Sequence, residues 1–538
     1  MNRRRALVSS ALLTTIIATG CSPGAEEGAS RADGVGYVLN SPLVTTNAAS
    51  REGVGVNAEQ VAARIYPGAF IAGPNGKIIP NVDLVSADEL PTDSLQVSYT
   101  IADNAVFSDG NPITCVDFQL AYAAGAMPDL FDSHQPIAQD VAGFECQPEA
   151  KRFRVTFAEG RGQRWREMFG PGTVLPAHTI AAAAGMDEAQ LHNALDAGDR
   201  AQLAGVADIW NHGFRLAEFD PTLQVSSGPL RIDSVGEAGE VHLVANPAYY
   251  GAPAAEPAIT LWPSSSDAAE LASNGALQVA ETPVAVPAWV NRDNPDNPYH
   301  VESQVGLLTE ALRFSDTGPL AEPDNRRALA ACIDRSAIAA VSSEASGVEV
   351  PPVAVHTVYH IDPVRHRLED IAAEYGSVDP QEAELLSATT VRIGYAGPNE
   401  RYARMVEAIA AGCESAGITV VDAGVDSASM ADLGRAYVDA EGTPSWTEGT
   451  IDAYLGAVDP QAEHSSVSSN ARDLEQLRVE EQRLWQELPL LPLSAQPRAF
   501  VFDKAVGNVV VYTGPAGIGW NVDRWQVSDE KATSESPE

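Results

Sequence analysis

The chain is short of positive charge. Its 538 residues hold 34 Lys and Arg against 73 Asp and Glu, for a formal net charge of −39 at pH 7. Nucleic acids and anionic lipid surfaces are bound through clustered Lys and Arg, so this balance argues against a nucleic-acid partner. Hydrophobic residues make up 45% of the chain, which excludes a disordered protein, and the length allows two to four domains with their own cores.

Motifs of catalytic and metal sites are also missing. The sequence contains no GxSxG, HExxH or glycine-rich phosphate loop. The one histidine cluster consists of His356, His360 and His366, and Pro363 interrupts any helix that would place them on one face. We therefore expect no metal, no cofactor and no enzymatic activity.

A short apolar run stands at the N-terminus, and no later stretch is long and apolar enough to cross a membrane. Residues 6–17 follow three arginines and lead into Ala18-Thr19-Gly20-Cys21. This pattern predicts an export signal over residues 1–20, and the small residues before Cys21 resemble the lipobox of bacterial lipoproteins. Cys21 would then carry lipid (palmitate) and anchor the protein to the outer face of the cytoplasmic membrane. A plain secretory signal is the alternative, and Arg4-Arg5 leaves Sec and twin-Arg export both open.

Cysteines are few and, apart from Cys21, even in number. An exported chain lies where disulfides persist, so the remaining four predict two bonds. Cys115 and Cys146 enclose a short segment and are expected to pair. Cys332 and Cys413 each end an apolar stripe; their pairing is the second prediction, with buried free thiols as its alternative.

Hydrophobic periodicity indicates an α/β fold. Val35 to Leu39 and Leu95 to Ile101 read as strands, and Thr114 with Asp117 forms a capping box that starts a helix. A strand, an amphipathic helix and a second strand then follow over residues 390–421, which is one βαβ unit. Residues 21–34 read as a tether and residues 528–538 as a polar tail.

Several segments in order resemble the family 5 extracellular solute-binding proteins of ABC importers, from an actinobacterial branch. The strongest is Tyr99 to Gly110, followed by Pro112, Thr114, Asp117 and Phe118. The others are Ser227-Gly228-Pro229-Leu230, Asn246 to Gly251, Arg326 to Arg335, Gly417-Ile418 and Leu488 to Leu493. Together they span residues 35 to 525.

The resemblance implies a two-lobed, periplasmic-binding-protein-like (type II) fold, in which two crossing strands join α/β lobes and the ligand lies between them. Lobe one would comprise residues 35–50, 172–255 and 495–527. An extra inserted domain would take residues 51–171, and lobe two residues 256–494.

The resemblance also implies a function: capture of di- or oligopeptides, or of another small solute, for import through an ABC permease and ATPase. A buried zwitterionic peptide needs a partner for its ammonium. Peptide-binding members use an Asp near an Asp-Pro pair, which points to Asp459 and, less directly, to Asp452. Other candidate ligand-binding residues are Asn40, Ser41, Asn47, Tyr122, Ser226, Ser227 and Trp446.

Two alternatives stay open at this point. A relative with the same fold is implicated in the synthesis of phosphatidylinositol mannosides, so a role in cell-wall glycolipid assembly competes with uptake. Each candidate Asp also has a structural explanation, as a helix cap or a solvated loop acid. In either role we expect a monomer.

Overall fold

The computed structural model describes residues 34–74, 77–425, 428–439, 442–464 and 474–528. The predicted signal (1–20), Cys21 and most of the tether and tail lie outside these residues. Within the described ranges, no helix combines the length and the apolarity needed to cross a membrane.

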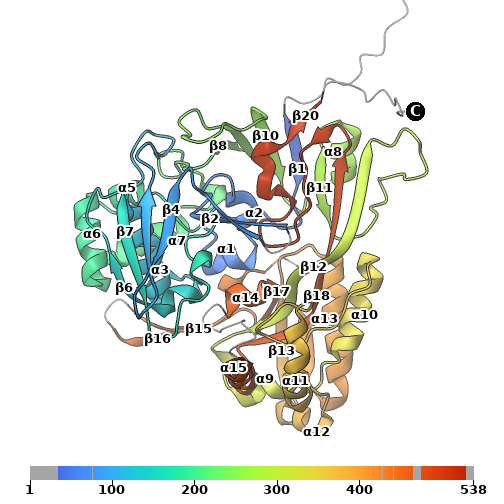
Figure 1. Ribbon diagram of the computed structural model, residues 1–538. Coiled ribbons are helices and arrows are strands. Elements are labelled where there is room, and N and C mark those ends of the chain that lie inside the picture. The colour runs from blue at the N-terminus through green and yellow to red at the C-terminus, as the bar shows by residue number, and fades with distance from the viewer. Residues whose placement is uncertain (1–33, 75–76, 426–427, 440–441, 465–473, 529–538) are drawn as a thin grey trace, which may run out of the picture.

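One ten-stranded sheet extends through both halves of the molecule (Figure 1). Its strand order is β14-β13-β17-β12-β18-β11-β1-β10-β9-β8. The strands are β1 (Val35–Val38), β8 (Leu230–Val235), β9 (Val241–Ala245), β10 (Ala258–Trp262), β11 (Val279–Thr282), β12 (Tyr299–Phe314), β13 (Thr390–Gly394), β14 (Thr419–Asp422), β17 (Ala453–Val458) and β18 (Leu490–Asp503).

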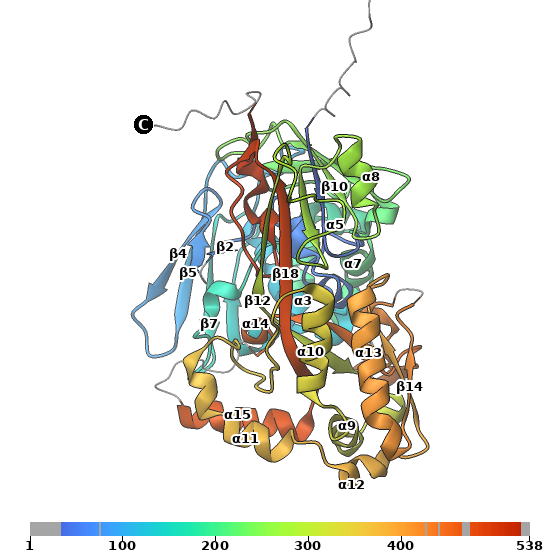
Figure 2. The same ribbon diagram turned by 90° about the vertical axis from the view of Figure 1, so that its right-hand side faces the viewer.

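Two long antiparallel strands connect the halves. β12 and β18 pair from Tyr299↔Asp503 to Arg313↔Leu490, and β18 runs from the upper part of the molecule down to the helices of lobe two in Figure 2. At one end β18 pairs with β11 of lobe one, and at the other β12 pairs with β17 of lobe two. The β12–β18 register shifts between Val305 and Thr309, where a bulge can bend the strands. The predicted two-lobed fold with crossing strands is confirmed.

Lobe one places helices beside its half of the sheet. These are α1 (Arg51–Gly55), α2 (Glu59–Ala62), α5 (Ala177–Ala183), α6 (Glu188–Ala197), α7 (Arg200–His212) and α8 (Ala268–Ser273). A core of Tyr37, Trp210, Leu243 and Trp525 holds β1, β9 and α7 together. Burial of such large side chains supplies most of the stabilisation of a lobe.

The inserted domain carries a separate four-stranded sheet of order β4-β5-β7-β6. Its elements are β4 (Val85–Leu90), β5 (Gln96–Ile101), β6 (Val141–Glu145), β7 (Arg152–Phe157) and α3 (Cys115–Ala126). Thr114 and Asp117 form the predicted capping box at the start of α3. The predicted Cys115–Cys146 disulfide is present and ties this helix start to the end of β6.

Lobe two contains the predicted βαβ unit. Its helices are α9 (Pro323–Ala330), α10 (Arg335–Ser346), α11 (Glu369–Tyr375), α12 (Pro380–Ala383), α13 (Glu400–Cys413), α14 (Pro460–Glu463) and α15 (Leu474–Glu487). Asn399 caps α13, and β13 and β14 pair in parallel on either side of that helix in the sequence. The predicted Cys332–Cys413 disulfide is also present and joins the end of α13 to the segment after α9.

Two of the predicted domain boundaries differ from the observed pairing. β10 and β11 lie within residues 256–494, which were assigned to lobe two, yet both pair in parallel with β1 of lobe one. Val61 and Ala62 of α2 were assigned to the insert but belong to the core of lobe one. Neither long-range parallel pairing nor the packing of a four-residue helix has a local sequence signal, which explains the two differences. The other boundaries stay predictions.

Candidate ligand-binding cleft

Two cavities lie between the lobes. The larger, of about 320 Å3, is lined from lobe one by the segment after β1 and from lobe two by the first turn of α13 and by β17. The smaller, of about 190 Å3, is lined by α1, α2, the inserted domain and the β17–α14 segment. Both share Asn57 and Ala457, so they are neighbouring parts of one interlobe cleft.

The smaller cavity is rich in acids, and we call it the acidic cavity. Glu59, Glu167, Asp459 and Glu463 line it, together with His134. Two of these acids have arginine partners: Glu167 pairs with Arg164, and Glu463 with Arg313. Among the described residues, Glu59 and Asp459 have no such ion-pair partner.

Asp459 is the predicted ammonium-binding residue, and it reaches the acidic cavity. It caps α14, so one of its oxygens accepts hydrogen bonds from the Gln461 and Ala462 amides. The other oxygen accepts from the Tyr359 hydroxyl at 2.9 Å. Burial and the nearby Asp459 raise the pKa of Tyr359, so the phenol stays a donor. Asp459 therefore caps α14 and also lines the acidic cavity.

Glu59, the first residue of α2, is a site residue that sequence reasoning missed. Its Oε1 is buried and has no hydrogen-bond partner. Burial, and then repulsion from Asp459, raise its pKa to about 8. No motif marks it in the sequence, because the cavity is lined by segments that lie far apart along the chain.

Glu463 connects lobe two to the inserted domain. Arg313 in β12 donates to both of its oxygens, at 2.8 and 2.7 Å, and His134 of the inserted domain lies 2.7 Å away. Burial opposes ionisation, but Arg313 and His134 outweigh it and hold the pKa of Glu463 well below its usual value. Tyr454 adds a further contact by donating to the Gly55 carbonyl at 3.0 Å. The His134 and Tyr454 bonds join lobe two to the inserted domain and to α1, respectively.

Asp452, the second predicted acid, lines neither interlobe cavity. Its side chain is 97% buried, and Arg392 donates to it from Nε at 2.9 Å and from Nη2 at 2.8 Å. The Arg392 amide adds a third bond at 2.8 Å. The observed contacts of Asp452 are thus those of a structural ion pair inside lobe two.

Asn40 and Ser41 line the larger cavity, as the resemblance implied. Gln60 connects them, because the Ser41 hydroxyl donates to Gln60 at 2.6 Å and the Gln60 amide donates to Asn40 at 2.9 Å. Across the cavity, residues 398–402 present the N-terminal end of α13. A helix N-terminus carries partial positive charge and favours an anionic group.

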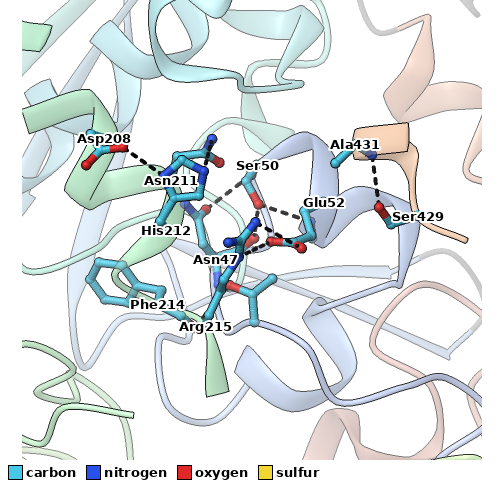
Figure 3. Close-up of polar contacts among 12 residues, drawn as sticks. Asn47, Ser50, Glu52, Asp208, Asn211, His212, Phe214, Arg215, Ser429 and Ala431 are labelled. Atoms are coloured by element: carbon cyan, nitrogen blue, oxygen red, sulfur yellow. Dashed lines mark hydrogen bonds and ion pairs between the residues drawn. The ribbon is translucent and has the colours of Figure 1, made fainter. Parts of the chain in front are cut away.

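Asn47 lies outside both cavities, beneath α1 (Figure 3). Its amide donates to the Trp210 carbonyl at 2.7 Å, and its oxygen accepts from the Ala49 and Ser50 amides. Ser50 in turn caps α1. Asn47 therefore fixes the backbone that leads into α1, which lines the cleft.

The remaining candidates also lie away from the cavities. Tyr122 stacks on Phe144 in the inserted domain, and Trp446 is 68% exposed on β16 (Pro444–Thr447). Ser226 donates to two backbone carbonyls, and the Ser227 carbonyl accepts from Tyr250. As ligand contacts these four stay predictions.

The histidine cluster is dispersed. His356 is fully buried against Glu481, with its Nδ1 2.8 Å from the carboxylate. No group of three or more metal-ligating side chains occurs in the part of the chain that the structure describes. His356 therefore forms a buried ion pair or hydrogen bond with Glu481 inside lobe two.

The chain has relatives along nearly its whole length. An uncharacterised lipoprotein of Mycobacterium tuberculosis is 30% identical over 561 residues, which cover 97% of each chain. A similar lipoprotein of Mycobacterium leprae is 31% identical over 552 residues, 96% of each. The oligopeptide-binding protein OppA of M. tuberculosis is 36% identical over 144 residues, 26% of this chain and 24% of that one.

Solved structures share the fold at low identity. The oligopeptide-binding protein of Thermus thermophilus, complexed with a pentapeptide, has a TM-score of 0.68 at 13% identity and covers 94% of this chain and 98% of its own. The periplasmic EDTA-binding protein EppA has a TM-score of 0.65 at 17% identity, covering 94% and 100%. The family model of the bacterial extracellular solute-binding proteins, family 5 (middle), matches residues 80–470. The chain therefore belongs to family 5 of the bacterial extracellular solute-binding proteins.

Proposed function

We propose that this protein captures short peptides in its interlobe cleft and delivers them to the permease and ATPase of an ABC importer. The observation that carries the proposal is Asp459: a carboxylate without an ion-pair partner among the described residues, on the wall of a cavity lined from both lobes. Burying an ammonium without a counter-charge costs several kcal/mol, and Asp459 removes that cost.

The larger cavity suits the rest of a peptide. Asn40, Ser41 and Gln496 line it with side-chain donors and acceptors, and α13 points its N-terminal end toward it. A peptide lying across both cavities would have its ammonium beside Asp459 and its carboxylate beside α13. Cavities of about 190 and 320 Å3 favour di- and tripeptides over long chains.

Membrane anchoring is the second part of the proposal. The relatives that match the whole chain are named lipoproteins, and Cys21 follows the small residues expected before a lipidated cysteine. A lipid on Cys21 would hold the protein on the outer face of the cytoplasmic membrane, beside its permease. Labelling with a palmitate analogue, lost in C21S, tests this part.

The experiment for peptide capture compares two aspartates. We expect di- and tripeptides to raise the melting temperature of the mature protein, and D459N to weaken their binding about 10- to 100-fold, the value of one charge-assisted hydrogen bond. D452N is the matched control, because it removes an equal charge seven residues away, outside the cavities. Failure of every peptide to bind, or equal binding by D459N and wild type, contradicts the proposal.

The glycolipid alternative stays open, because the relatives that match end to end are uncharacterised lipoproteins and the OppA match covers 26% of the chain. The acids of the cleft count against it, because a site for acyl chains would be lined by apolar side chains. Binding of a phosphatidylinositol mannoside by wild type, in place of any peptide, would select the alternative.

A further inference from the structure

The acidic cavity holds more carboxyl groups than one ammonium can pair with. Glu167 and Glu463 are each matched by an arginine, which leaves Glu59 and Asp459. Asp459 keeps three hydrogen bonds, from Tyr359 and the start of α14, whereas the Oε1 of Glu59 has none. A buried carboxylate oxygen without a donor is rare, because the lost hydration is not replaced. Glu59 thus has an oxygen for which the described residues of the cleft supply no hydrogen-bond donor.

The surroundings of Glu59 are suited to an aliphatic stem that ends in a cation. Val54, Ala58, Ile137, Pro171 and Val458 contribute apolar wall to the same cavity. An alkyl chain packs against such a wall while its charged end meets the carboxylate. The volume of about 190 Å3 is of the size of one long side chain rather than of a whole peptide.

We propose that Glu59 is a second ligand-binding acid, and that with Asp459 it makes the cleft selective for peptides with two positive charges at their amino end. The α-ammonium would lie beside Asp459 and a lysine-like side chain would place its ammonium beside Glu59. This inference rests on the proposed function and narrows its substrate class to peptides with a basic first residue.

Ligand binding would exchange a proton for a cation. Burial and Asp459 raise the pKa of Glu59 to about 8, so the empty cleft keeps this carboxyl protonated at neutral pH. An arriving ammonium favours the carboxylate, and the proton leaves to the buffer. Tyr512 is near both acids, Arg164 and Tyr359 are beside Asp459, and His134 is bound to Glu463.

The test compares Lys-Ala with norleucyl-alanine, which has the same α-ammonium and nearly the same side-chain shape but no second charge. In calorimetry at pH 7, wild type is expected to bind Lys-Ala at least tenfold more tightly. E59Q should reduce this preference to about twofold or less, and D459N should weaken both peptides. E407Q, which removes an exposed acid of α13, is the control for total charge and should keep the preference.

Proton release supplies a second readout. In buffers of different ionisation enthalpy, Lys-Ala binding to wild type should release protons at pH 7, and binding to E59Q should release fewer. Equal affinity for the two peptides in wild type, or an undiminished preference in E59Q, would overturn the role of Glu59 while leaving peptide capture standing. If neither peptide nor any other short peptide binds, peptide capture fails as well.

Discussion

The interior of lobe two and the wall of the acidic cavity hold their acids in different ways. Asp452 inside lobe two receives three hydrogen bonds from Arg392, and Glu310 on β12 pairs with the buried Arg401. Glu59 and Asp459, at the cleft, have no arginine or lysine partner within the described ranges. A paired acid has its charge satisfied by the fold, whereas an unpaired acid in a cavity is available to a ligand.

Glu463 combines features of the two classes, because it lines the acidic cavity and is also paired with an arginine. Glu463 lines the acidic cavity, but its carboxylate is already bound by Arg313 and His134. It follows Asp459 by four residues on the same short helix, so its contact with His134 fixes the helix that Asp459 caps against the inserted domain. The position of Asp459 is therefore tied to the inserted domain through α14.

The largest effect is expected at this paired acid. E463Q leaves Arg313 largely buried without a counter-charge, which typically costs about 3–5 kcal/mol. Urea unfolding followed by circular dichroism should show the loss. E407Q is the control, since its exposed carboxylate should matter little. A loss below about 1 kcal/mol would mean that the pairing of Glu463 contributes little to the fold.

A smaller loss is expected for D452N. The amide keeps one acceptor oxygen, and Arg392 is 42% exposed, so water can rehydrate the guanidinium. We expect about 1–3 kcal/mol of destabilisation in the same urea experiment. Peptide affinity should stay within about twofold of wild type. Weakened binding in a fully folded D452N would put Asp452 among the ligand-binding residues and remove the contrast with Asp459.

Sequence reasoning found both aspartates but had no means to separate them. Asp452 and Asp459 stand in one short stretch, and each fits the start or the end of the same motif. The difference arises from Arg392, which lies 60 residues earlier, in β13, and meets Asp452 only in the folded sheet. Glu59 was not identified from the sequence for the same reason. Helix α2 has four residues and no motif, and the cavity that Glu59 lines is formed by segments distant in the sequence.

Helices, strands and caps were predicted more fully than the pairing of strands that are distant in the sequence. The capping box at Thr114 and the βαβ unit over residues 390–421 depend on side chains close in sequence, and the structure contains both. The assignment of β10 and β11 to lobe two failed because their pairing with β1 joins residues more than 200 positions apart. Such pairing is decided by which faces must be buried together.

The effect expected at the unpaired acid has the reverse sign and depends on pH. The pKa of Glu59 is raised to about 8 from an ordinary value of 4.5, so the folded protein holds a proton that the unfolded chain releases. Stability therefore falls as pH rises from about 4.5 to 8, and E59Q removes that loss. Without ligand, E59Q should melt at the wild-type temperature at pH 4.5 and above it at pH 8, while E407Q should show no such divergence. A lower melting temperature for E59Q at pH 8 would mean that Glu59 already has a favourable partner in the empty cleft, and would place it with Asp452 among the structural acids.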